Sequence, residues 1–208
     1  MASKPPAERS GKLSRARIIE IAFEHFATYG YRGASLAKIA AEVGISQPGL
    51  LYHFPTKTAL FMGVLKARDL HDLELVELHT EDLEDLDFLK MLDYFELVVE
   101  HNARNRNMVQ LAHLIAAEAG NLEHPAREWV VERMTAFRSL CTSAIAKSVE
   151  RGDIRADADP SEVATMLIAA SEGLENQWLI EPSIDLAGSF KVFLAMLRRD
   201  LQAGQPPT

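Results

Sequence analysis

Apolar residues recur at spacings of three and four along almost the whole chain, which is the period of an α-helix. Between about 14 and 30, for example, Ile18, Ala22 and Phe26 fall on one face of such a helix. The strict alternation of apolar and polar residues that is typical of strands is scarce. The pattern therefore predicts an all-α protein.

Capping residues and helix breakers divide this pattern into nine segments. Serine, threonine and aspartate favour helix starts, whereas glycine and proline favour helix ends. The strongest start is Asp159-Pro160-Ser161-Glu162, which combines an acceptor cap, a proline in the first turn and a glutamate at the third helical position. The acidic run at 81–85 predicts a solvated turn. The expected helices cover about 14–30, 35–42, 46–53, 57 to the high 70s, 86–103, 106–119, 124–151, 160–180 and 184–202.

The composition is that of an ordinary globular protein: 208 residues, 48% hydrophobic and 25% charged. A single cysteine, Cys141, cannot form an intrachain disulfide, which suits a reducing cytosol. The polar N-terminus lacks the apolar run of a signal peptide, and no stretch approaches the roughly 18 apolar residues of a membrane span. We therefore expect a cytoplasmic protein without a membrane partner.

Charge is distributed unevenly along the chain. Residues 1–66 hold nine basic and four acidic side chains, a surplus of five positive charges. Because the whole chain has a net charge of −8, the remaining residues carry a net charge of −13. This division indicates that only the N-terminal part faces a polyanion. On charge alone, chance clustering explains the same distribution equally well.

The segment 35–53 has the pattern of two short helices that cross closely at a tight turn. Ala40 and Gly44 are small at the crossing, and apolar residues on both sides can clamp the pair. This is the logic of a helix-turn-helix, whose second helix enters the major groove with its first residues nearest the bases. With Ser46 as cap, Pro48 lies in the first turn, where it loses no hydrogen bond, and Gly49 lets the backbone approach the groove wall.

The segment from Arg17 to Leu65 resembles the DNA-binding part of TetR-family transcriptional regulators. The resemblance rests on "T-Y-G-Y-R-G-A-S-L-A-K-I-A-A-E-V-G-I-S", "L-Y-H-F" and "K-T-A-L-F", and near the C-terminus on "S-E-G-L-E-N-Q-W-L-I-E-P". It implies a homodimer, usually a repressor, that binds a palindromic operator and is released by a small molecule. The domains expected are a flexible basic arm over 1–13, a helix-turn-helix domain over 14–55, and a ligand-binding and dimerisation domain over 56–208.

Matching positions imply the DNA contacts. The residues Ser46, Gln47, Pro48 and Gly49 match the groove-facing first turn, Tyr52 and His53 match phosphate contacts, and Lys57 matches a lysine that meets phosphate from the fourth helix. Leu51 departs from the pattern, because family members usually carry an aromatic residue there. Leu51 therefore meets a thymine methyl or contributes nothing polar, and the operator sequence cannot be borrowed from relatives.

The chemistry of the individual side chains supports the same DNA contacts. Gln47 can pair with adenine through two hydrogen bonds, worth about 1–3 kcal/mol of discrimination. Lys57 and Arg17 offer positive charge to phosphates. Ser35 and Ser46 can donate to phosphates, and simple helix capping is an equally good explanation for both. For Tyr52 and His53 the alternative is packing under the fourth helix.

Catalytic and metal chemistry find no support in the sequence. The seven histidines show no H-E-x-x-H or Glu-x-x-His spacing, and there is no nucleophile motif, phosphate loop or dinucleotide fingerprint. We therefore expect no enzyme activity, no cofactor and no metal site.

The remainder of the chain is expected to hold a largely apolar effector between its helices. For any single residue, ordinary core packing is the competing explanation. The candidate ligand-binding residues are Leu92, Phe95, Val99, Leu114, Trp129, Met134, Phe137, Met166, Glu172 and Asn176.

The last two helices carry apolar stripes that suit a four-helix dimer interface. The alternative is that these stripes only close the chain's own core. The stripes are formed by Val163, Leu167, Ala170, Leu174, Trp178, Leu186, Phe190, Phe193, Leu194 and Leu197. A second function class also stays open at this point, a helical adaptor that binds protein partners and no DNA.

Overall fold

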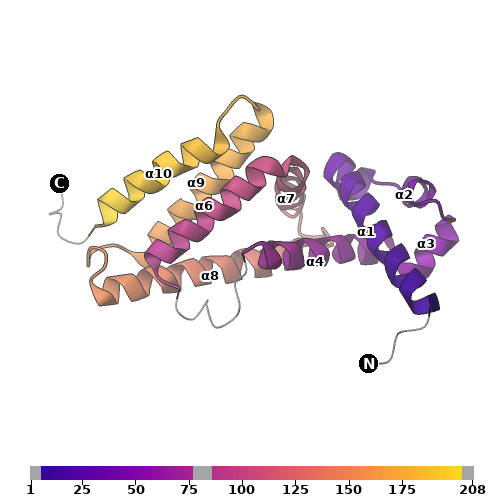
Figure 1. Cartoon of the computed structure of the whole chain (residues 1–208), viewed down its shortest axis with the longest axis horizontal. Helices are drawn as coiled ribbons and strands as arrows, with labels where there is room; N and C mark the ends of the chain where they lie inside the picture. The colour runs from indigo at the N-terminus through magenta and orange to yellow at the C-terminus, as the bar shows by residue number, and fades with distance from the viewer. Residues whose placement is uncertain (1–5, 77–85, 203–208) are drawn as a thin grey trace. The chain divides into compact units, whose positions relative to one another are not determined.

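The computed structural model describes residues 6–76 and 86–202, of which 6–14 and 69–76 are described by their backbone alone. In these ranges the chain forms nine helices and no strand beyond an isolated bridge between Ile154 and Gln202 (Figure 1), so the all-α prediction is confirmed. The helices are α1 (Pro6–Gly33), α2 (Leu36–Val43), α3 (Gln47–His53), α4 (Lys57–Val76), α6 (Phe88–Arg104), α7 (Arg106–Glu118), α8 (Arg127–Arg151), α9 (Pro160–Ile180) and α10 (Leu186–Leu201).

Helix ends agree with the sequence signals at most positions. Asp159 caps α9 by accepting from the amides of Ser161 and Glu162, at 2.8 and 3.0 Å. Helix α1 differs, because it begins at Pro6 and so covers much of the predicted arm. Proline at a first helical position needs no amide hydrogen, so Pro6 can begin a helix without loss. The acidic run at 81–85 lies outside the described residues.

The chain divides into two compact units. The first comprises residues 1–75 and 110–127, and the second comprises 76–109 and 128–208. In the first unit, Phe26 of α1 and Phe61 of α4 are fully buried with ring centroids 4.7 Å apart. Each such side chain contributes roughly 2–3 kcal/mol by leaving water. Ile39 and Leu50 are also fully buried, so α2 and α3 are fixed by the apolar residues between them.

The second unit is a bundle in which α10 packs on both α6 and α9 (Figure 1). Its core contains Phe95 and Phe190, whose ring centroids are 6.2 Å apart. On its surface the ammonium of Lys191 lies 3.3 Å from a carboxylate oxygen of Glu96 and 2.6 Å from one of Glu100, which joins α10 to α6. Within the described ranges, no helix is long and apolar enough to cross a membrane.

Candidate nucleic-acid interface

Helices α2 and α3 meet at the turn around Gly44. Its φ of 84° lies in the left-handed region, and its amide donates to the carbonyls of Ala40 and Ala41 at the end of α2, both at 3.1 Å. Glycine suits this position because L-residues are strained there. The turn therefore fixes the direction in which α3 leaves α2.

The first turn of α3 has the geometry that its sequence predicts. The hydroxyl of Ser46 accepts from the amide of Gly49 at 3.2 Å, and Pro48 lies in the first turn. Gln47 and Pro48 are exposed, while Leu50 is fully buried beneath them. This edge of α3 is thus free to meet a groove while the helix stays anchored to the core.

The remaining predicted contacts of α3 differ in exposure. Tyr52 is 86% exposed, so packing does not account for it. His53 is half-buried and meets the Tyr52 ring edge-on, with centroids 5.5 Å apart. Leu51 is half-buried and offers only apolar atoms. The predicted roles of these residues on DNA stay predictions.

The sequence analysis missed Arg15 as a part of this site. Its guanidinium donates to the carbonyl of His53 at 3.0 Å and lies 4.2 Å from the centroid of the Phe54 ring. A cation is favourable at a helix C-terminus, where carbonyls lack partners. Only its basic charge could have pointed to it, because Arg15 and His53 are 38 positions apart and no local pattern reveals their contact.

Two predicted phosphate contacts already have partners in this chain. Arg17 forms an exposed ion pair with Glu20 at 2.9 Å, and such a pair is weak enough to be exchanged for a phosphate. The ammonium of Lys57 donates to the carbonyl of Arg32 at 3.0 Å and lies 5.1 Å from the Tyr31 ring centroid. Burial lowers the pKa of Lys57, and the negative charge of Glu118 partly opposes this by raising it.

Ser35 behaves as a cap in the structure. Its hydroxyl accepts from the amide of Lys38 at 3.5 Å, at the long limit for a hydrogen bond. A further contact that the sequence did not predict holds α2 to α1, because Nε2 of the buried His25 lies 2.8 Å from a carboxylate oxygen of Glu42. The helix-turn-helix is therefore braced by polar contacts as well as by its apolar core.

The structure brings together some of the candidate ligand-binding residues. Leu92, Phe95 and Val99 lie in the core of the second unit, with Met134 and Phe137 packed against it, and the Phe95 and Phe137 ring centroids are 5.2 Å apart. The others do not join this cluster as buried residues. Leu114 belongs to the first unit, Trp129 is half-buried beside Arg133, and Met166, Glu172 and Asn176 are exposed on α9.

The predicted dimer residues divide into two groups. Leu167, Leu186, Phe190 and Leu194 are buried in the chain's own core. The others are only partly buried: Val163, Ala170, Leu174, Trp178, Phe193 and Leu197.

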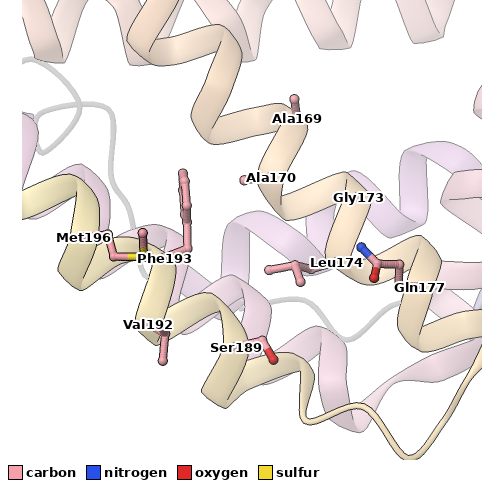
Figure 2. A pocket seen from close by; sticks show the side chains of 9 residues that line it. All are labelled: Ala169, Ala170, Gly173, Leu174, Gln177, Ser189, Val192, Phe193 and Met196. Carbon is pink, nitrogen blue, oxygen red and sulfur yellow. The ribbon is translucent and has the colours of Figure 1, made fainter.

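Three of the partly buried residues, Ala170, Leu174 and Phe193, line a shallow pocket of about 410 Å³ between α9 and α10, and their side chains point into the space between the two helices (Figure 2). Val192 and Met196 on α10 extend this apolar surface and are 62% and 54% exposed, although the helical pattern had not singled them out.

Comparison with known proteins agrees with this geometry. The family profile described as "Bacterial regulatory proteins, tetR family" matches residues 18–64, which contain α2 and α3. A second profile, "Tetracyclin repressor-like, C-terminal domain", matches residues 111–182. The probable HTH-type transcriptional regulator ArpR of Pseudomonas putida is 28% identical over 84% of this chain and 85% of its own length.

Two solved structures illustrate the fold. A transcriptional regulator from Saccharomonospora viridis in complex with choline has a TM-score of 0.74 at 21% identity, covering 93% of this chain and 100% of its own. FadR from Bacillus subtilis in complex with stearoyl-CoA has a TM-score of 0.73 at 18% identity, covering 90% and 99%. The two profiles, the relative and the exposed first turn of α3 lead to one conclusion. The chain belongs to the TetR family of DNA-binding transcriptional regulators, and it is not an enzyme.

Proposed function

We propose that the chain binds a palindromic operator as a homodimer and represses transcription until a small, largely apolar effector releases it from the DNA. The observation that carries the proposal is the first turn of α3, where Gln47 and Pro48 are exposed above the fully buried Leu50. Exposed residues at the start of the second helix of a helix-turn-helix are those that reach base edges.

The palindrome follows from the proposed dimer. A two-fold symmetric dimer presents two identical recognition helices, so its preferred site repeats as an inverted pair. The dimer is supported by the apolar surface of α9 and α10, where Val192 and Met196 are exposed beside the pocket. Apolar patches of this kind commonly mark protein interfaces.

The aromatic and apolar core of the second unit supports the proposed effector. Phe95 packs there against both Phe137 and Phe190, and aromatic and aliphatic residues of this kind line small-molecule sites. Choline and stearoyl-CoA bound to the two solved regulators show that relatives of this fold hold small molecules of different chemistry. In this chain the aromatic cluster favours a largely apolar molecule.

The DNA proposal is tested by selecting duplexes from a randomised pool with the purified protein and measuring affinity by mobility shift. Gln47→Ala should reduce the preference for the selected duplex over a scrambled one by roughly 5- to 150-fold per half-site, because each bidentate base contact is worth about 1–3 kcal/mol. Lys57→Ala should instead weaken binding to both duplexes alike. A loss of the preference between the two duplexes therefore identifies a base contact, whereas an equal loss of affinity for both identifies a phosphate contact.

The control and the contrary outcome are both direct. Lys66→Ala removes a positive charge from the exposed surface of α4 and should leave the preference unchanged. If the wild type enriches no duplex, or if a Gln47→Ala/Tyr52→Ala double variant binds as the wild type does, the operator proposal is wrong. A helical adaptor for protein partners would then be the better account.

A further inference from the structure

Helix α1 is interrupted near its end by Gly30. Its φ of 66° and ψ of 177° break the helical geometry, which resumes through Gly33. The amide of Tyr31 therefore follows a break and lacks the partner that a continuous helix would supply. A carboxylate oxygen (Oε2) of Glu118, at the end of α7, accepts from this amide at 3.2 Å.

The approach of Glu118 to this turn is unusually close. A Cβ atom on Gly30 would lie 2.8 Å from the other carboxylate oxygen (Oε1) of Glu118 and 3.4 Å from a methyl carbon of Leu114. The positive φ favours glycine at this position, and the Glu118 carboxylate occupies the space that a Cβ would take. At the break in α1, the Glu118 carboxylate therefore packs against Gly30 and binds the amide of Tyr31.

His124 makes a second contact to Oε2 of Glu118, the oxygen that accepts from the Tyr31 amide. Its Nδ1 accepts from the amide of Ala126 at 3.3 Å, which places the proton of the neutral ring on Nε2. Nε2 lies 3.3 Å from Oε2 of Glu118, too poorly aligned for a hydrogen bond but close enough for electrostatic attraction. The His124 side chain is buried beside the Glu118 carboxylate.

The other side of the turn is held by the start of α4. The Tyr31 hydroxyl lies 2.8 Å from the Thr58 hydroxyl, and the Lys57 ammonium donates to the Arg32 carbonyl. Lys57 follows α3 after only the segment 54–56. Glu118, the turn and Lys57 all belong to the first unit and form one continuous chain of contacts.

We propose that Glu118 is a positioning residue for DNA binding, which fixes the turn at 31–32 and thereby directs the Lys57 ammonium to a backbone phosphate. This inference rests on the proposed function, because it requires that Lys57 contact DNA. It assigns to α7 a specific task, the orientation of a phosphate contact through the backbone of α1.

The experiment measures affinity for the selected duplex at several salt concentrations. Glu118→Ala should weaken binding about tenfold and reduce the log–log salt slope by about 0.9 per protomer, the value of one lost phosphate contact. Glu118→Gln keeps an oxygen that can accept from the Tyr31 amide, so it should retain most of the affinity. Glu123→Ala, which removes an exposed carboxylate from the same unit, is the matched control and should not lower the slope.

A double-mutant cycle separates positioning from a general loss of stability. In a Lys57→Ala background, Glu118→Ala should have little further effect, because the contact that it positions is already missing. An equal loss in both backgrounds, an unchanged slope, or equal weakening by the Gln and Ala variants would overturn the inference. A wild type that enriches no duplex would instead contradict the proposed function itself.

Discussion

Cys141, the only cysteine of the chain, lies on α8 within the core of the second unit and is 1% exposed. Burial raises the pKa of its thiol to about 12 because a thiolate is poorly stabilised among apolar neighbours. This environment is that of a cysteine that serves packing. At the scale of single residues, the surroundings thus turn a reactive group into an inert one.

The thiol should therefore resist alkylation in the native protein. At pH 8 only roughly one thiol in ten thousand is ionised when its pKa is about 12, so iodoacetamide should label the folded chain very slowly. The same protein unfolded in guanidinium chloride should be labelled within minutes, which serves as the control. Rapid labelling under native conditions, measured by mass spectrometry, would show that Cys141 is accessible as a thiolate.

At the scale of elements, α3 is held at both ends by different means. The cap of Ser46 and the buried Leu50 fix its start, while Arg15 of α1 binds the carbonyl of His53 at its end and covers the Phe54 ring. A short helix of this kind has too few internal hydrogen bonds to be stable alone. Its orientation therefore depends on α1 as much as on α2.

Two arginines that lie two residues apart on α1, Arg15 and Arg17, should then differ in effect. Arg15→Ala should lower the free energy of unfolding by about 1–2 kcal/mol, because a charge-assisted hydrogen bond and a cation–π contact are lost together. Arg17→Ala, which breaks only the exposed pair with Glu20, should cost less than about 0.5 kcal/mol. Urea denaturation compares the two, and equal costs would argue against the anchoring role of Arg15.

The sequence predicted local features well and distant contacts poorly. Caps such as Asp159 and Ser46 act within three residues, so the starts of α9 and α3 could be located from the sequence. The contact between Tyr31 and Glu118 spans 87 positions, and no periodicity reveals it. Helix α9 shows a second limit, because it is apolar on more than one side: Leu167 is buried while Met166 beside it is 62% exposed.

At the scale of the whole molecule, the chain combines a basic N-terminal part with an acidic remainder. The surplus of positive charge in residues 1–66 belongs to the unit that contains α2 and α3, which is also the unit of the proposed DNA surface. The apolar surface of α9 and α10 lies in the other unit. DNA binding and dimerisation are thus proposed on different units.

The proposed dimer is tested by Val192→Asp on α10. A charge at an apolar two-fold interface is buried twice, so the variant should become a monomer with half the wild-type mass, near the chain mass of 23.1 kDa. Leu97→Asp on α6, at a position of similar exposure, is the matched control and should stay dimeric. Light scattering at micromolar concentration decides between them, and a monomeric wild type would remove the dimer proposal.

The residue at position 44 is restricted by its left-handed backbone conformation and not by the space for a Cβ atom. Nothing lies within 4 Å of the place where a Cβ would stand, so a Cβ would find room there. What excludes an alanine is the φ of 84°, which costs an L-residue about 1 kcal/mol and would cost its mirror image nothing. The angle between α2 and α3 therefore depends on the one amino acid that has no chirality.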